Sequence, residues 1–416
     1  MMHQSAFQLL SDRFRALDPS DAQYATRFVE LLLETARALE ASDIHLQPTP
    51  DGLELRLRID GVLQPLGVFP SGVAANIVAR LKVLADLLTY RTDVPQEGRI
   101  RAAGQVEMRV SSFPTLYGEK AVVRLFGGGR LLKLDDLGLP NEITVRLRHL
   151  LAETAGAILV TGPAGSGKTT TAYAALRELV ASSGSGRSIA SLEDPIETAI
   201  PGVAQSQVNP AAGFDLATGL RSLMRQDPEV ILVGEIRDRA TAEIAFQAAL
   251  TGQLVLSTFH AASATGAISR LSDMGIEPYL LRSGVLAIIS QRLVRRLCDC
   301  RKPIHDDAAL LGLPARQGWT VDGCEQCGGT GYRGRMVLAE MFTADASELG
   351  RAILTKSDAA ALERLAIAAG MVSRWQRAIA AVELGATSPA EVRRALGFGD
   401  ALDGRAGLQI NEAEHG

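Results

Sequence analysis

Residues 157–171 read AILVTGPAGSGKTTT, an apolar run that passes into a glycine-rich loop and then into a stretch with helical spacing. From Gly162 to Thr169 the loop matches G-x-x-x-x-G-K-[ST], a motif whose backbone N–H groups wrap around phosphates at a helix N-terminus. Lys168 would reach the β- and γ-phosphates, and the Thr169 hydroxyl would ligate Mg²⁺. A glycine-rich turn without a ligand is the alternative, which the predicted strand before the loop and the helix after it disfavour. The predicted nucleotide-binding residues are Gly162, Pro163, Ala164, Gly165, Ser166, Gly167, Lys168, Thr169 and Thr170.

Acidic residues follow two other predicted strands. The run SIASLED places Glu193 and Asp194 at a strand end, and VILVGEI places Glu235 directly after apolar residues. Because the C-terminal ends of parallel strands converge on one crevice, we expect both groups to point toward the phosphates. One carboxylate would polarise the attacking water and another would hold Mg²⁺ through water. A further strand, QLVLSTF, precedes His260, for which a structural hydrogen bond and a contact with the γ-phosphate are equally open.

The first 130 or so residues have the pattern of a small α+β domain. Apolar residues at helical spacing predict helices over 24–40 and 73–88. Residues 53–60 alternate apolar and charged side chains, which predicts a half-buried strand and a hairpin turn at Asp60-Gly61. VEMRVSS and AVVRLF predict two more strands, and the glycine run FGGGR at 126–130 is interpreted as a linker. Beyond it, short apolar strands alternate with helical stretches, which predicts a parallel α/β sheet.

Composition narrows the class of protein. The 416 residues suffice for two or three domains, and 43 Lys and Arg against 47 Asp and Glu give a net charge of −4. A basic surface for non-specific binding to nucleic acid is therefore not implied. No stretch approaches the roughly 20 apolar residues that span a bilayer, and the N-terminal residues lack the apolar core of a secretory signal. The expected compartment is the cytosol.

All four cysteines fall into two short stretches, LCDC and GCEQCG, at Cys298, Cys300, Cys324 and Cys327. From Pro278 onward the pattern around them is mostly helical, and the polar stretch from about Gly399 is expected to be disordered. A metal site, a disulfide cluster and chance are all open. A reducing cytosol favours metal, because clustered thiols there bind metal more often than they form disulfides.

Taken together, these motifs resemble the secretion and pilus ATPases of bacterial type II secretion and type IV pilus assembly. The resemblance extends over about residues 24–396. Its signature blocks are ASDIHLQP, RIDGVL, VPQEGRI, MRVSSFPTLYGEK, LVTGPAGSGKTTT, SLEDPIE, RQDPEVILVGEIRD, LVLSTFH, GTGYRGR and AAGMV.

The resemblance implies an α/β fold assembled as a homohexamer. A PAS-like α+β N-terminal domain would precede a RecA-like P-loop ATPase domain that carries a zinc-binding insertion and C-terminal helices. The expected segments are an N-terminal tail, the PAS-like domain, the ATPase core, the tetracysteine zinc segment, a C-terminal helical subdomain and a disordered tail, at residues 1–22, 23–130, 131–297, 298–335, 336–398 and 399–416.

Site roles also follow from the resemblance. Glu193 would be the general base, Glu235 the Walker B acid that holds Mg²⁺ with Thr169, and His260 the histidine of the His box. Phosphate-sensing arginines would complete the site, because a guanidinium stabilises the charge that develops on the transferred phosphoryl group. The matching positions are Arg99, Arg109, Arg124, Arg221 and Arg225.

The family's assembly branch carries two C-x-x-C pairs that bind Zn²⁺ in a closed structural site, and its retraction branch lacks them. Here the zinc ligands would be Cys298, Cys300, Cys324 and Cys327, although the first pair is one residue shorter. Two further departures are Gln253 and Ala261-Ala262, which replace residues of the usual TGHLVLSTLHTN. About 20 residues precede the PAS-like domain, which makes recruitment through an additional N-terminal domain doubtful.

The function implied is an ATP-hydrolysing motor, with ATP, Mg²⁺ and Zn²⁺ as cofactors, that powers pseudopilus or pilus assembly for type II secretion. It would be a cytoplasmic protein, peripheral at the inner membrane, acting with a platform protein and a membrane-recruiting subunit and not with nucleic acid. Alternatives are a type IV pilus or competence-pilus motor and a nucleotide-binding regulatory subunit with little turnover. The cysteines argue against a retraction motor, and the charge argues against a DNA translocase.

Overall fold

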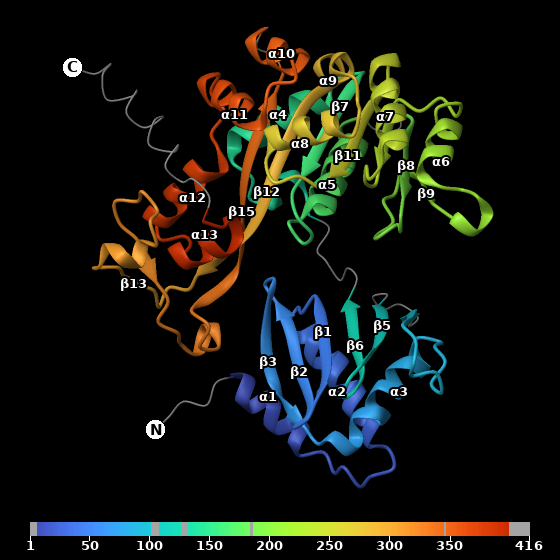
Figure 1. The fold of residues 1–416 in the computed structure, drawn as a ribbon, viewed down its shortest axis with the longest axis vertical. Helices are drawn as coiled ribbons and strands as arrows, with labels where there is room; N and C mark the ends of the chain where they lie inside the picture. The colour runs from blue at the N-terminus through green and yellow to red at the C-terminus, as the bar shows by residue number, and fades with distance from the viewer. Residues whose placement is uncertain (1–5, 101–107, 126–131, 184–185, 345–346, 399–416) are drawn as a thin grey trace. The chain divides into compact units, whose positions relative to one another are not determined.

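The computed structural model comprises two compact units, drawn in Figure 1. One contains residues 1–130 with the segments 298–301 and 321–334, and the other contains residues 131–297, 302–320 and 335–416. The expected linker at 126–130 and the expected tail from 399 lie outside the described residues. The structure describes residues 6–100, 108–125, 132–183, 186–344 and 347–398.

The N-terminal part of the first unit is a six-stranded sheet with helices packed on one face. The strands are β1 (Asp43–Thr49), β2 (Gly52–Ile59), β3 (Val62–Phe69), β4 (Gln96–Ile100), β5 (Met108–Thr115) and β6 (Gly118–Leu125). They are ordered β3-β2-β1-β6-β5-β4 with antiparallel pairing. The helices are α1 (Ala6–Arg15), α2 (Tyr24–Ala38) and α3 (Ala74–Leu84).

Alternation of side chains explains this sheet. Leu53, Leu55 and Leu57 are fully buried in the core, as the LELRLRID pattern predicts, while the charged residues between them face the other way. The predicted hairpin is confirmed, because Asp60 and Gly61 both have positive φ between β2 and β3. The predicted strands β5 and β6 are present, whereas β1 and β4 had no prediction.

The second unit is built on a seven-stranded sheet of order β15-β12-β7-β11-β10-β8-β9. Its strands are β7 (Gly156–Thr161), β8 (Ile189–Glu193), β9 (Ala204–Gln207), β10 (Val230–Val233), β11 (Leu254–Phe259), β12 (Val285–Leu297) and β15 (Tyr332–Thr343). The short strands β13 (Lys302–Pro303) and β14 (Trp319–Thr320) pair with each other. The four predicted strands β7, β8, β10 and β11 are present and parallel, so the expected parallel sheet is confirmed.

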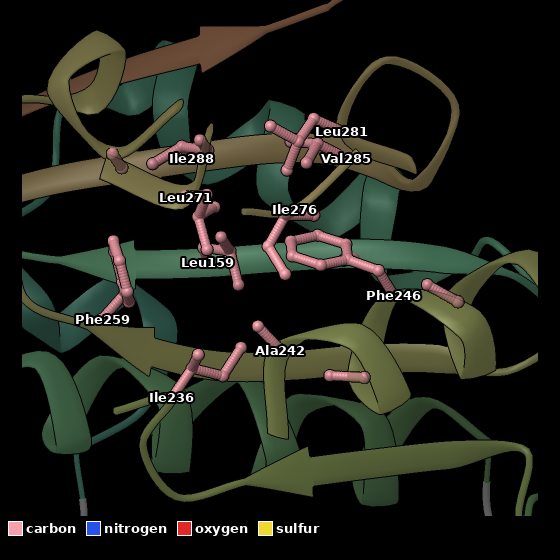
Figure 2. Packing of buried hydrophobic residues seen from close by; sticks show 14 of the residues in the cluster. Leu159, Ile236, Ala242, Phe246, Phe259, Leu271, Ile276, Leu281, Val285 and Ile288 are labelled. Carbon is pink, nitrogen blue, oxygen red and sulfur yellow. The ribbon is translucent and has the colours of Figure 1, made fainter. Parts of the chain in front are cut away.

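Helices cover both faces of this sheet. They are α4 (Asn141–Leu151), α5 (Lys168–Ser183), α6 (Leu216–Leu223), α7 (Arg239–Thr251), α8 (Ala264–Asp273), α9 (Pro278–Gly284), α10 (Ser347–Leu354), α11 (Ala359–Ala368), α12 (Arg374–Glu383) and α13 (Pro389–Leu396). Successive strand residues enter opposite cores: Leu159 packs with α7 and α8, and Ile158 packs with α4 and α5. Figure 2 shows the first of these cores, which contains Leu159, Phe246, Leu271 and Ile276.

The expectation of a mostly helical chain from Pro278 is wrong. Two long strands, β12 of 13 residues and β15 of 12 residues, extend the central sheet here, and the expected boundary between residues 335 and 336 falls inside β15. The apolar run at the start of β12 does not by itself separate a buried strand from a buried helix. Pairing with β7 decides for the strand, because Ile288 and Ile289 are then buried on the two faces of the sheet.

No helix within the described ranges is both long enough and apolar enough to cross a membrane.

Candidate functional site

The glycine-rich loop lies where the sequence predicts, between the end of β7 and the first turn of α5. Gly165 and Gly167 have φ of +73° and +87°, a left-handed conformation that glycine adopts without the strain of a side chain. Lys168 is buried, and its Nζ donates to the carbonyl oxygens of Gly162 and Pro163, each at 3.0 Å. The loop therefore presents an ammonium group beside backbone N–H groups at a helix N-terminus, an arrangement that attracts anions.

Glu235 and His260 meet at the neighbouring strand ends. Glu235 follows β10 and His260 follows β11, and the two side chains join through Nε2 and Oε1 at 2.7 Å. The second carboxylate oxygen of Glu235 accepts from Arg237 Nε at 2.8 Å. The ends of β10 and β11 are held in register by Thr258, whose hydroxyl donates to Gly234 O at 2.7 Å.

Charges interact strongly around Lys168. Burial lowers its pKa, the nearby Glu235 carboxylate opposes that shift, and the charge of Arg292 adds to it. Burial and the positive charge of Lys168 likewise lower the pKa of His260, although Glu235 acts in the opposite direction. The imidazole is therefore neutral at pH 7 and donates its Nε2–H to the Glu235 carboxylate. The charges of Lys168 and Glu235 and the protonation of His260 therefore influence one another.

Glu193 ends β8 and is almost completely buried. Its carboxylate accepts hydrogen bonds from the Tyr173 hydroxyl, from Ser191 Oγ at 2.6 Å and from Gln205 Nε2 at 3.1 Å. Burial and the adjacent carboxylate raise the pKa of Tyr173, so its hydroxyl stays protonated and acts as a donor. Three donors thus fix the orientation of Glu193, and its role as general base stays a prediction.

Three of the five predicted arginines form one row across the N-terminal sheet. Arg99, Arg109 and Arg124 are cross-strand neighbours on β4, β5 and β6, and the row continues through Asp43 to Arg58. The buried Asp43 carboxylate binds both flanking guanidiniums, with 2.9 Å to Arg124 Nε and 3.4 Å to Arg58 Nε. This row lies on the face opposite the apolar core, and Asp43 and Arg58 were not predicted for the site.

The other two predicted arginines belong to the second unit. Arg221 lies in the last turn of α6 and Arg225 follows that helix, and both are exposed. Arg225 donates to Arg221 O at 3.1 Å and to Ser222 Oγ at 3.3 Å. Contact of either guanidinium with phosphate stays a prediction.

The four cysteine thiols converge. Cys298 Sγ lies 3.8 Å from Cys324 Sγ, Cys300 Sγ lies 4.0 Å from Cys327 Sγ, and all four sulfurs are within 4.8 Å of one another. Thiolates about 2.3 Å from a tetrahedral Zn²⁺ would lie about 3.8 Å apart, so this donor set fits zinc in both chemistry and spacing. Burial would raise the pKa of Cys327, but N–H groups of Cys324 and Gly331 donate to its sulfur and lower that pKa to about 7.

Several residues of the site had no prediction. Arg237 lies inside the GEIRD block, two residues after Glu235, so the motif could have predicted the contact between them. Tyr173 and Gln205 reach Glu193 only through tertiary folding, and no sequence signal marks them. Arg292 donates to Ala262 O at 2.8 Å in the loop after His260, and it was missed because β12 was interpreted as helical.

Comparison with known proteins adds independent information. Residues 18–394 match the family model described as Type II/IV secretion system protein. The chain is 40% identical over 368 residues to the Type IV pilus assembly ATPase PilB of Thermus thermophilus, which covers 85% of this chain and 41% of that protein. It is 45% identical over 345 residues to Type II secretion system protein E of Klebsiella pneumoniae, which covers 81% of this chain and 69% of the relative.

A solved structure shares the fold. The ATPase DotB of Legionella pneumophila superposes with a TM-score of 0.65 at 22% identity, covering 91% of this chain and 97% of that chain. The family model and the two relatives confirm the predicted family. The chain therefore belongs to the type II/IV secretion system protein family.

Proposed function

We propose that this chain is the motor that hydrolyses ATP to power pseudopilus or pilus assembly. Its relatives are named for type II secretion and for type IV pilus assembly, so both systems remain open, with a competence pilus as a variant of the second. It acts as a homohexamer at the cytoplasmic face of the inner membrane. Its partners are a membrane platform protein and a membrane-recruiting subunit.

One observation carries the proposal. The lysine of the phosphate loop and the Glu235–His260 pair meet at the C-terminal ends of three adjacent parallel strands, β7, β11 and β10. In open α/β sheets this edge is where ligands bind. The arrangement supplies a cradle for phosphates, a carboxylate beside it and a neutral imidazole, which are the parts that phosphoryl transfer needs.

Each residue has a task in this scheme. Lys168 and the loop N–H groups neutralise the phosphates, while Thr169 and Glu235 offer the oxygen ligands that Mg²⁺ prefers. Bound Mg²⁺ would supply charge neutralisation between the phosphate oxygens. Glu193 polarises the attacking water, which requires its carboxylate to exchange at least one of its three hydrogen bonds. The arginines Arg99, Arg109, Arg124, Arg221 and Arg225 stabilise charge on the transferred phosphoryl group.

The remaining assignments are proposals of the same kind. Residues 23–130 form a PAS-like domain, and residues 131–297 form a RecA-like ATPase core. The four cysteines hold a structural Zn²⁺, which the spacing of their sulfurs supports and which favours an assembly motor over a retraction motor.

Release of inorganic phosphate tests the motor hypothesis. Purified full-length chain should release phosphate from Mg·ATP, and Lys168→Ala and Glu235→Gln should abolish this activity. If the wild type releases no more phosphate than these variants, even with phospholipid and the cytoplasmic part of a platform protein present, a nucleotide-binding regulatory subunit becomes the better assignment. Sedimentation with and without Mg·ATP measures the hexamer separately.

A further inference from the structure

Gln291 is a buried polar residue on β12, the strand that pairs with β7 beside the phosphate loop. Both ends of its side-chain amide are engaged with the site. Nε2 donates to the carbonyl oxygen of Ser166 at 2.7 Å, and Oε1 accepts from the Thr171 hydroxyl at 2.9 Å. One side chain thus connects the tip of the phosphate loop with the first turn of α5.

The bond to Ser166 determines the direction of a whole peptide unit. The C=O of Ser166 and the N–H of Gly167 belong to one planar trans peptide and point in opposite directions. Holding the carbonyl against β12 therefore turns the Gly167 N–H away from β12, toward the side that cradles an anion. If the peptide flipped, a carbonyl oxygen would face the phosphates and repel them.

Close packing against β12 restricts the conformation of the phosphate loop. A Cβ built on Gly162 would lie 2.5 Å from the backbone oxygen of Gln291, and one on Gly167 would lie 3.1 Å from its Nε2. The loop glycines therefore allow contact with β12 in addition to their permissive backbone angles. A residue that only filled space here would not need an amide, because burying one costs free energy unless both ends are hydrogen-bonded.

We propose that Gln291 is a positioning residue of the nucleotide site, which orients the Ser166–Gly167 peptide for binding the phosphates. This rests on the proposed function, because it assumes that the loop binds a nucleotide. Gln291 acts through the loop and touches no reacting atom. Thr171 supports it by fixing the amide so that the NH₂ group faces Ser166.

The test uses the full-length chain with Gln291→Met, which keeps the length of the side chain and removes both hydrogen bonds. We expect the Kd for Mg·ADP and the KM for Mg·ATP to rise about tenfold, with a smaller fall in kcat, because the loop binds phosphate in both ground and transition states. Thr171→Val keeps the bond to Ser166 and should raise both constants about threefold. In the Gln291→Met background, Thr171→Val should add almost nothing.

Ser290→Ala is the matched control. Ser290 is equally buried on the same strand, and its hydroxyl has no hydrogen-bond partner among the described residues. Its Kd for Mg·ADP should equal that of the wild type. If Gln291→Met lowers the melting temperature but leaves the Kd and KM unchanged, its role is merely structural and the inference is overturned, while the proposed function stands. If the wild type itself binds no Mg·ADP, the proposed function fails first and the inference fails with it. Should Gln291→Met not fold, Thr171→Val decides alone, and a wild-type Kd in that variant overturns the inference.

Discussion

The buried carboxylate of Glu391 offers a sharp test of how β12 is held in place. Glu391 lies on α13 with a fully buried side chain, and Arg295 on β12 binds it with Nε at 3.0 Å and Nη2 at 2.7 Å. The backbone N–H of Arg295 donates to the same carboxylate at 3.0 Å, and Arg394 Nε donates at 2.8 Å. The substitution Glu391→Gln removes the charge while keeping the shape.

The expected loss is large because two guanidiniums would lose their anion. Removing one partner of a buried ion pair costs about 3–5 kcal/mol, and we take about 3 kcal/mol because glutamine keeps one acceptor oxygen. For a unit of this size, a loss of 1 kcal/mol lowers the melting temperature by about 2 °C, so the calorimetric transition should fall by about 6 °C at pH 7. The exposed pair Glu348–Arg351, separated by 4.0 Å, provides the control, and Glu348→Gln should shift the transition by less than about 1 °C.

The same residue predicts a pH dependence. Burial alone would raise the pKa of Glu391, but hydrogen bonds from Arg394 and Arg295 outweigh it and lower that pKa. A carboxylate with a depressed folded pKa stabilises the fold above its unfolded pKa and loses that contribution as the pH falls through the folded value. The difference between wild type and Glu391→Gln should therefore be full at pH 7 and shrink below about pH 4. A fall no larger than that of Glu348→Gln at pH 7 would refute the reasoning.

Three further predictions concern the site. Cys300→Ser should reduce bound zinc from near one equivalent per chain to well below it, measured by mass spectrometry on protein never exposed to chelators; unchanged zinc would contradict a four-thiolate site. Because the pKa of His260 is lowered, kcat should be flat from pH 7 to 8 and decline only below the ordinary imidazole value of about 6.5, as the imidazole becomes charged, and in His260→Gln this decline should be absent from the pH–rate profile. Asp43→Asn should lower kcat about tenfold by releasing Arg124, whereas Asp51→Asn in an exposed turn should not change it; equal phosphate release by both variants would exclude a positioning role for Asp43.

Local signals account for the parts of the fold that sequence predicted. The strand before Gly162 and the helix from Lys168 are fixed by a short apolar run and a motif that needs a strand-to-helix turn. The hairpin at Asp60-Gly61 follows from the alternation before it and from residues that accept positive φ. Each of these features is determined within a few residues, so neighbours in sequence suffice to find it.

The features that the sequence did not predict share one physical cause, because they depend on contacts between residues far apart along the chain. β12 is a strand because β7 and β15 lie on either side of it, and no residue within 285–297 reveals those neighbours. Gln291 in particular is a polar interruption of an apolar run in the sequence, although both ends of its amide are hydrogen-bonded, to Ser166 and to Thr171. The hydrogen bond between Glu193 and Tyr173 was missed for the same reason, because the two residues are 20 positions apart along the chain.

The shortened cysteine pair, Cys298 and Cys300, still brings both of its thiols to the cluster. A C-x-C arm appears too tight only if both of its thiols must face the same pair of partners. In the structure each thiol of the arm meets a different partner, Cys298 with Cys324 and Cys300 with Cys327, while Asp299 between them is exposed. Asp299 and Cys300 are the central residues of a turn that is closed by the Arg301 N–H, which donates to Cys298 O at 3.0 Å, and this turn brings both thiols of the arm into the cluster. One intervening residue is therefore sufficient to bring the four thiols within 4.8 Å of one another, so the shorter arm still contributes both of its thiols to the cluster.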